Sequence, residues 1–339
     1  MKQAIMVAPS QIELRDVPVP APGPGEVRLK IYRIGVCGSD VHVYHGRHPF
    51  TRYPVVQGHE FSGEVEAVGP GVTDLRLGVK VTALPQIVCG ACRPCRRGEY
   101  HICDHLRVQG FQAPGCAQEL WVTKAEKILP LPETISYDQG ALVEPTAVAV
   151  HAVSRIGDLA GCRAVVLGAG PIGNLVAQVA RTEGAEVLIV DLSSFRLDAA
   201  KSCGISATSN AAAEPLDQAM ARTFGEAGFD VAFECVGAEA TVDAAICHLQ
   251  KGGALVIVGV FGMKPQVNLG LVQDRELKIY GTLMYRREDY TRAIELIASA
   301  QIATAPLISR HFPLREYAQA YQFIESQGNK ALKVFIDLE

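Results

Sequence analysis

The sequence has no long hydrophobic run, no basic run and no internal repeat. No stretch approaches the roughly 20 uninterrupted apolar residues that a membrane-spanning helix needs, so we expect no membrane span. Lys and Arg total 32 against 36 Asp and Glu, a net charge of −4. This mildly acidic balance argues against a nucleic-acid or membrane-surface binder. The apolar part of residues 1–9 is too short for a signal peptide, and we therefore expect a cytoplasmic protein.

The first 131 residues have the pattern of an irregular, mostly antiparallel β domain. The chain has 339 residues, of which 48% are hydrophobic and 20% charged, and this length suggests about two packed domains. Short strand patterns separated by glycine and proline occur at 27–31, 64–69 and 80–84. Residues 27–31 alternate between apolar and polar side chains, as a half-buried strand does.

From about residue 137 the pattern changes to alternating helices and strands. Apolar runs predict strands at 163–167, 186–190, 229–234, 254–258 and 333–336, and helices are expected at 138–154, 174–183, 290–300 and 314–325. Such alternation is typical of a doubly wound parallel sheet in an α/β protein.

A glycine-rich turn follows the strand predicted at 163–167. It matches G-x-G-x-x-G and comprises Gly168, Ala169, Gly170, Pro171, Ile172 and Gly173. In a strand–turn–helix context these glycines allow a tight turn, close approach of a pyrophosphate and close packing of the helix on the strand. The sequence therefore predicts a dinucleotide site here.

Asp191 ends the next predicted strand, 18 residues after Gly173. A carboxylate at this place accepts hydrogen bonds from a ribose diol and repels a 2′-phosphate, so we expect NAD rather than NADP. Arg196 is a nearby cation that would weaken this preference.

Four of the ten cysteines lie within fifteen residues, namely Cys89, Cys92, Cys95 and Cys103. In a reducing compartment such clustering indicates metal ligands rather than disulfides. Four thiolates saturate the tetrahedron of Zn²⁺, which predicts a closed, structural site. An iron–sulfur cluster also takes four cysteines, but hydride transfer gives such a cluster no role.

A second candidate donor set is spread along the chain and comprises Cys37, His59, Glu60 and Glu144. A thiolate, an imidazole and a carboxylate make a mixed zinc site with room for water or substrate. Taken singly, each residue is ambiguous, because a lone Cys37 is more often a buried small hydrophobe. Glu144 is flanked by apolar residues and would be costly to bury without a partner.

Taken in order, these motifs resemble the zinc-containing medium-chain alcohol and polyol dehydrogenase family. The likeness covers essentially the whole chain and is strongest to the sorbitol (L-iditol) dehydrogenase branch, through the segments 35–42, 143–145 and 233–237. It implies a GroES-like β catalytic domain over 1–146 and 288–339, with a Rossmann NAD-binding domain over 147–287.

The resemblance also implies roles for single residues. Cys37, His59 and Glu60 would be ligands of the catalytic zinc, and Glu144 a ligand or an exchangeable neighbour of it. Ser39 would begin a proton relay that His42 continues. It further implies two zinc ions per chain, NAD as cofactor, and a homodimer or homotetramer.

The substrate is the least determined feature. The resemblance places Phe50, Phe111 and Tyr285 at the substrate site and implies oxidation of a polyol to a ketose, in a reversible reaction. Sorbitol dehydrogenases usually have an Arg-Tyr pair where this chain has Met284-Tyr285. Sugar-acid (L-galactonate-like) and L-threonine or amino-alcohol dehydrogenases therefore stay open as alternatives. A non-enzymatic nucleotide sensor would not need the open zinc site.

Overall fold

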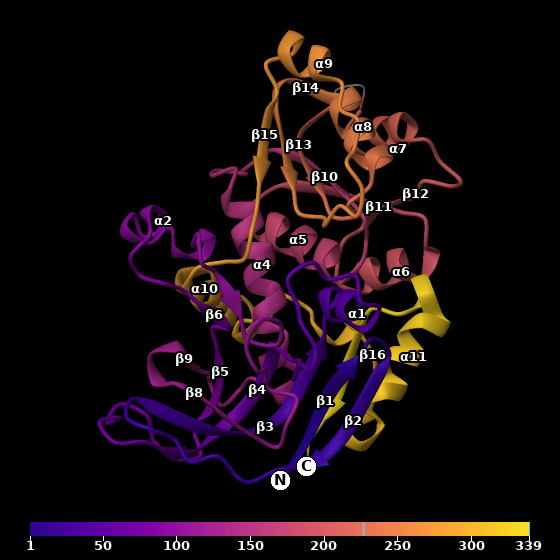
Figure 1. Cartoon of the computed structure of the whole chain (residues 1–339). Helices are drawn as coiled ribbons and strands as arrows, with labels where there is room; N and C mark the ends of the chain where they lie inside the picture. Colours follow the sequence, from indigo (N-terminus) through magenta and orange to yellow (C-terminus); the bar gives the residue numbers. More distant parts are fainter. Residues whose placement is uncertain (226–227, 339) are drawn as a thin grey trace. The chain divides into compact units, whose positions relative to one another are not determined.

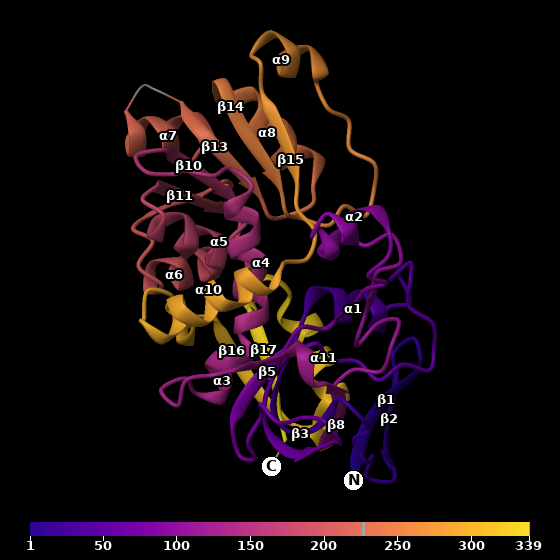
Figure 2. The ribbon, with the colours of Figure 1, turned by 90° about the vertical axis from the view of Figure 1, so that its left-hand side faces the viewer.

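The computed structural model describes residues 1–225 and 228–338, so Glu226, Ala227 and Glu339 lie outside the described residues. The chain forms two compact units, which Figures 1 and 2 show in sequence colours. The first unit comprises Met1–Glu144, Arg286–Ala298 and Ile308–Glu339, and the second comprises Pro145–Tyr285 and Ser299–Leu307. None of the described helices is both long and apolar enough to cross a bilayer.

The first unit is built on a seven-stranded sheet. Its order is β16-β17-β3-β4-β5-β9, with β8 paired to β3. The strands are β3 (Glu26–Val36), β4 (Glu60–Val68), β5 (Lys80–Ala83), β8 (Leu120–Lys124), β9 (Ile128–Pro130), β16 (Ile308–Pro313) and β17 (Lys333–Asp337). Among the described strands of this sheet, only β16 and β17 pair in parallel. The predicted irregular, mostly antiparallel β fold is confirmed.

Two ribbons and five helices complete the first unit. The ribbons pair β1 (Lys2–Ala8) with β2 (Gln11–Asp16) and β6 (Gln86–Ile87) with β7 (Arg107–Val108). The helices are α1 (Gly38–Tyr44), α2 (Arg93–Arg96), α3 (Tyr137–Ala141), α10 (Arg287–Ala298) and α11 (Tyr317–Gln327). In the core, Val27, Leu29 and Ile31 of β3 are fully buried, as the alternating pattern predicts.

The second unit holds a six-stranded sheet in which every pairing is parallel. Its order is β12-β11-β10-β13-β14-β15. The strands are β10 (Arg163–Leu167), β11 (Glu186–Asp191), β12 (Ala207–Asn210), β13 (Phe229–Glu234), β14 (Leu249–Ile257) and β15 (Lys278–Gly281). Numbered within the unit, this order is 3-2-1-4-5-6, that of a doubly wound dinucleotide-binding fold. The predicted Rossmann sheet is confirmed.

The helices of the second unit alternate with its strands. They are α5 (Pro171–Thr182), α6 (Ser194–Ser202), α7 (Leu216–Phe224), α8 (Glu239–His248) and α9 (Leu269–Asp274), and α4 (Val143–Ser154) runs into this unit from the first. The single helix expected over 138–154 is two helices, α3 and α4, because α3 ends at Ala141 and Leu142 is its C-cap.

Residues 299–307 belong to the second unit, whereas the predicted ranges placed them in the first. The reason is a pair of hydrogen bonds. The side chain of Gln178 donates from Nε2 to the carbonyl of Ala303 at 3.2 Å, and the amide of Ala303 donates to Gln178 Oε1 at 2.7 Å. A buried amide side chain needs such partners, and so this segment is held to α5.

Candidate functional site

The glycine-rich turn lies between β10 and α5. Gly168 has φ +103°, and a Cβ added at Gly173 would lie 1.8 Å from the carbonyl oxygen of Gly168. Both positions therefore require glycine. Gly170 is the N-cap of α5, and Pro171 and Ile172 begin that helix. The first amides of α5 thus have the arrangement that holds a phosphate.

Asp191 ends β11 beside this turn. Its carboxylate accepts hydrogen bonds from the amides of Ala169 and Ser193, both at 2.7 Å. Arg196 Nη1 lies 3.9 Å from Asp191 Oδ2. The structure therefore brings Asp191 and Arg196 together at the end of β11, next to the turn.

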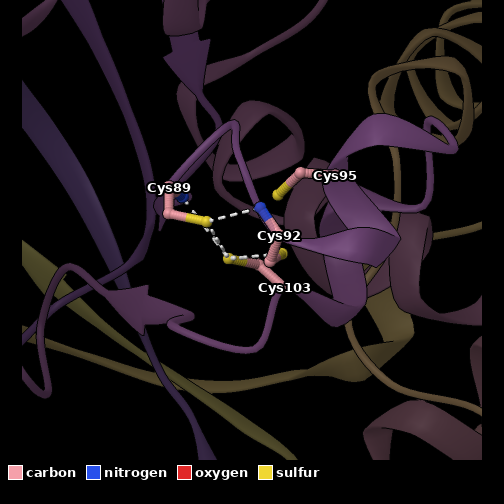
Figure 3. A group of neighbouring side chains, drawn as sticks. All are labelled: Cys89, Cys92, Cys95 and Cys103. Atoms are coloured by element: carbon pink, nitrogen blue, oxygen red, sulfur yellow. Dashed lines mark hydrogen bonds between the residues drawn. The ribbon is translucent and has the colours of Figure 1, made fainter.

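The four clustered cysteines lie around one point, which Figure 3 shows. Cys92 Sγ and Cys103 Sγ are 3.8 Å apart, and Cys103 Sγ and Cys89 Sγ are 3.6 Å apart. Sulfurs at about 2.3 Å from a tetrahedral Zn²⁺ are about 3.8 Å from one another. These distances are too long for disulfides and fit a closed Zn(Cys)₄ unit.

The loop also favours the thiolate form of Cys89. The backbone amides of Ala91 and Cys92 donate to the sulfur of Cys89 and lower the pKa of this thiol to about 6. The helix within the loop, α2, has no buried residue in the described structure. Little apolar packing therefore holds this loop, and a metal would supply its stability.

The second donor set is formed where β3 and β4 pair. Gly35 lies opposite Glu60 in antiparallel register, so Cys37 just beyond β3 and His59 just before β4 come together. The ligand atoms of Cys37, His59 and Glu60 lie within 4.8 Å of one another. A Cβ at Gly35 would lie 2.2 Å from Glu60 Oε2, so only glycine leaves room for this carboxylate.

His59 is an incompletely satisfied member of this set. Its Nδ1 is buried and makes no hydrogen bond to any residue that the structure describes. Burial alone would lower the pKa of His59, but the charges of Asp40, Cys37 and Glu144 raise it to about 10. A soft thiolate, an imidazole with an unused nitrogen and a carboxylate fit Zn²⁺ with an open position.

Asp40 contacts two members of this donor set, Cys37 and His59. It is 1% exposed, and its carboxylate accepts hydrogen bonds from the amide of Cys37 at 2.9 Å and from Gln57 Nε2 at 3.2 Å. Desolvation raises the pKa of Asp40. Tyr321 of α11 donates to Gln57 Oε1 at 2.8 Å. This chain of contacts fixes the carboxylate that lies 3.7 Å from His59 Nδ1.

Lys333 forms a buried ion pair with Glu60. Its Nζ donates to Oε2 at 2.7 Å and to Oε1 at 2.8 Å, and it also reaches the carbonyl oxygen of Val36 at 3.4 Å. The side chains are 4% and 1% exposed. Burial alone would lower the pKa of Lys333, but Glu60, Cys37 and Glu144 raise it above its ordinary value. One ammonium therefore neutralises part of the negative charge of this site.

We expect Lys333→Met to lower the free energy of unfolding by about 3–5 kcal/mol, because it leaves the Glu60 carboxylate buried without its cation. The double variant Lys333→Met/Glu60→Gln should recover much of this loss, since it removes both charges. Urea denaturation measures the free energy of unfolding of the single and the double variant. As a control, Lys2→Met breaks an exposed pair with Asp16 and should have no measurable effect. Equal midpoints for Lys333→Met and the wild type would contradict this account.

The remaining predicted residues fall in different places. Glu144 is 6% exposed and lies in the first turn of α4, outside the 4.8 Å group, although its charge acts on His59. Ser39 and His42 lie on α1, with Ser39 half-buried and His42 exposed.

Of the three predicted substrate residues, Phe111 lies beside the donor set, with its ring 4.8 Å from that of His59. Phe50 is 72% exposed, and Tyr285 is fully buried in the second unit. His48 was not predicted. Its ring stacks on Phe111 at 4.8 Å, and burial first, then the charges of His42 and His59, lower its pKa.

Asp40, Gln57 and Lys333 were also missed, although Asp40 and Lys333 each carry a signal in the sequence. Asp40 lies in the same segment as Cys37. Lys333 is a charged residue at the start of a predicted buried strand, where a lysine needs a partner.

Two family models match the chain. Residues 23–133 match the alcohol dehydrogenase GroES-like domain, and residues 171–299 match the zinc-binding dehydrogenase model. The chain is 38% identical over 319 residues to a 2-dehydro-3-deoxy-L-galactonate 5-dehydrogenase of Pseudoalteromonas atlantica, covering 92% of each protein. It is 31% identical to a sorbitol dehydrogenase of Bacillus subtilis, covering 99% of this chain and 97% of that protein.

The fold has solved counterparts as well. A zinc-binding dehydrogenase of Sinorhizobium meliloti, bound to NADP, superimposes with a TM-score of 0.93 at 31% sequence identity, and the match covers 99% of each chain.

Proposed function

Because this chain belongs to the family of zinc-containing medium-chain alcohol and polyol dehydrogenases, we propose that it oxidises a secondary alcohol of a polyol or sugar derivative to a ketone, reversibly, with NAD. The observation that carries this proposal is the buried set of Cys37, His59 and Glu60, whose ligand atoms lie within 4.8 Å of one another. The dinucleotide turn at 168–173 supplies the second requirement of the reaction, a place for the hydride acceptor.

The residues of the open donor set would hold a zinc ion through Cys37, His59 and either Glu60 or Glu144. When bound, zinc supplies Lewis-acid chemistry, which lowers the pKa of an alcohol hydroxyl. In the oxidation the substrate loses a hydride from its carbinol carbon to the nicotinamide and a proton from its hydroxyl. The hydroxyl of Ser39 accepts this proton and gives up its own to His42, which is exposed on α1 and passes a proton to solvent.

The four-cysteine loop would hold a second, structural zinc through Cys89, Cys92, Cys95 and Cys103. All four positions of its tetrahedron are filled by thiolates, which leaves no place for substrate. We therefore expect two zinc ions per chain, with one role each.

The substrate class is argued from the relatives and from Arg286 and Arg287. A guanidinium is the usual partner of a carboxylate, so a free arginine near the site would favour an acidic substrate. The 38% relative acts, by its name, on a sugar acid, which favours a carboxylated substrate, and the sorbitol dehydrogenase favours a neutral polyol. The guanidinium of Arg287 donates to the carbonyls of Ile128 and Glu126, so it is engaged with the backbone. Arg286 Nε donates to His101 Nδ1 at 3.3 Å. These contacts argue for a substrate carboxylate bound elsewhere.

A substrate panel on zinc-replete protein tests the function. It should contain sugar acids, neutral polyols and L-threonine at one pH, with NADH formation as the readout. Turnover of a secondary alcohol in the first two classes is expected. Turnover of L-threonine alone would select the amino-alcohol alternative. No turnover, with a single zinc ion per chain, would indicate a protein that kept only the structural site.

We propose NAD over NADP because of Asp191, whose charge lies where a 2′-phosphate would approach. Asp191→Ala should reduce the ratio of kcat/KM for NAD to that for NADP by about tenfold, the size of one charge-assisted hydrogen bond. Initial rates with both cofactors measure it. Asp198→Ala, an exposed carboxylate on α6, is the control and should leave the ratio unchanged. Wild-type protein that already uses both cofactors equally would show that Arg196 dominates.

We also propose a homodimer or homotetramer. Most of the apolar strand predicted at 254–258 belongs to β14, which lies inside the sheet. Within the described residues the edge strands are β12 and β15, and β15 pairs only with β14. Ile279 on β15 and Leu283 just beyond it are 43% and 52% exposed. Open edges and exposed apolar side chains are usually covered. Light scattering at micromolar concentration should give a multiple of 36.4 kDa, and a monomeric mass would refute this proposal.

A further inference from the structure

A fully buried carboxylate stands at the carboxyl end of β13. Glu234 is 0% exposed, although no lysine or arginine is hydrogen-bonded to it among the described residues. A buried carboxylate without a cation must be compensated by hydrogen bonds. Glu234 is not one of the candidate metal ligands and does not lie in the glycine-rich turn.

The compensation comes from the loop that follows the strand. Glu234 Oε1 accepts hydrogen bonds from the amides of Val236 and Gly237, both at 2.9 Å, and from the hydroxyl of Thr241 at 2.7 Å. Oε2 accepts a further bond from the amide of Gly237 at 3.1 Å. The carboxylate therefore determines the path of residues 235–241, because three donors of that segment converge on it.

Glu234 organises the loop after β14 as well. Its main-chain carbonyl accepts hydrogen bonds from the amides of Val258 and Gly259, both at 2.8 Å. A Cβ added at Gly259 would lie 2.6 Å from Glu234 Oε2 and 2.2 Å from the amide of Gly237. The two loops are thus packed together around one side chain, with no room for a larger residue at 259.

The first of these loops lies directly against the dinucleotide turn. The amide of Cys235 donates to the carbonyl of Leu167, the last residue of β10, at 2.8 Å. A Cβ at Gly168 would lie 2.8 Å from Val236 Cγ2, and one at Gly173 would lie 3.4 Å from Cys235 Cβ. The backbone that Glu234 holds therefore forms one wall of the turn.

The strand order assigns this wall to one half of the cofactor. A sheet of order 3-2-1-4-5-6 consists of two mononucleotide-binding halves that meet between strands 1 and 4, which here are β10 and β13. Asp191, on β11, belongs to the half that takes the adenosine. The loops after β13 and β14 belong to the other half, which takes the nicotinamide nucleoside.

We propose that Glu234 is a positioning residue for the nicotinamide half of the cofactor: it holds the loops after β13 and β14 in the shape that receives the nicotinamide nucleoside. This inference rests on the proposed function, because it assumes that the turn binds a nicotinamide dinucleotide. It assigns to Glu234 an effect on one end of the cofactor and none on the other.

The test compares NADH with ADP, which has the adenosine and the pyrophosphate but lacks the nicotinamide nucleoside. In Glu234→Gln an amide replaces a carboxylate that accepts four hydrogen bonds, and one end of that amide is a donor facing other donors. Calorimetric titration of the full, zinc-replete chain should show the Kd for NADH raised about tenfold and the Kd for ADP changed less than twofold. The wild type provides both reference values.

Two further variants separate positioning from general stability. Asp230→Asn lies at the opposite end of the same strand, where Asp230 accepts a hydrogen bond from the amide of Arg163 at 2.8 Å. It should lower the melting temperature without changing the ratio of the two Kd values. Thr241→Val removes one donor and keeps the carboxylate, and should raise the Kd for NADH about threefold. This milder variant serves if Glu234→Gln does not fold.

The outcomes are distinct. Wild-type protein that binds neither NADH nor ADP would refute the proposed function, and the inference with it. If the wild type binds both ligands, equal weakening of the two in Glu234→Gln and Thr241→Val would make Glu234 a residue of the fold alone. Unchanged binding of both ligands would overturn the inference too. In those last two cases the proposed function stands.

Discussion

Cys37→Ser should abolish turnover while the protein stays folded. The sulfur of Cys37 is one of three ligand atoms within 4.8 Å in the open set, and a serine hydroxyl is a poor ligand for Zn²⁺. Loss of Lewis-acid stabilisation of several kcal/mol corresponds to a fall in kcat of about a thousandfold or more. Bound zinc should fall from two ions per chain to one.

Folding should survive this change because the first unit has its own core, in which Val27, Leu29 and Ile31 are fully buried. We expect a melting temperature within about 3 °C of the wild type and an unchanged Kd for NADH, since the dinucleotide turn lies in the other unit. Elemental analysis, a melting curve and NADH titration measure the three quantities. Cys247→Ser, a half-buried thiol on α8 outside both clusters, is the matched control and should match the wild type.

Cys95→Ser should instead destabilise the protein. Helix α2 carries this residue and has no buried side chain among the residues described, so metal binding supplies most of the free energy that folds the loop. With one of four thiolates gone, we expect the melting temperature to fall by on the order of 10 °C, together with a lower soluble yield. Activity should fall as a consequence, in proportion to the folded fraction.

The loop has two further attachments that its release would break. Tyr100 accepts a hydrogen bond from the amide of Arg287 at 2.7 Å through its hydroxyl, and His101 Nδ1 accepts one from Arg286. Arg287 begins α10 and Arg286 directly precedes it, so disorder in the loop should spread to that end of the helix. A Cys95→Ser protein that melts like the wild type but is inactive, beside a Cys37→Ser protein that unfolds, would show that the two sites have exchanged roles.

The sequence predicts those sites whose functional residues all lie in one contiguous segment. The four cysteines at 89–103 and the glycines at 168–173 each form a site through local backbone geometry, so their spacing is sufficient evidence. The strand at 163–167 has the predicted bounds, because residues 164–167 are a continuous apolar run, as is typical of a buried parallel strand. The strand at 229–234 also has the predicted bounds, although Asp230 and Glu234 interrupt its apolar residues.

The open donor set is an intermediate case. Cys37, His59 and Glu60 are each ordinary in isolation, and only the likeness to a family grouped them. Their proximity follows from the pairing of Gly35 with Glu60, a register that no local pattern states. The break between α3 and α4 at Leu142 was not predicted either, although Pro145 is tolerated only in the first turn of a helix and so marks the start of α4.

Tertiary structure alone decided how the charges are balanced. Lys333 lies 273 residues from Glu60, yet its ammonium contacts both oxygens of that carboxylate, and Tyr321 supports Asp40 through Gln57 over a similar span. Glu234 is compensated by the hydroxyl of Thr241 and by two backbone amides, and backbone amides look the same in every sequence. Burial sets these partnerships, because a charge removed from water must find whichever donor or cation the folded chain brings to it, and that choice depends on distance in space rather than along the sequence.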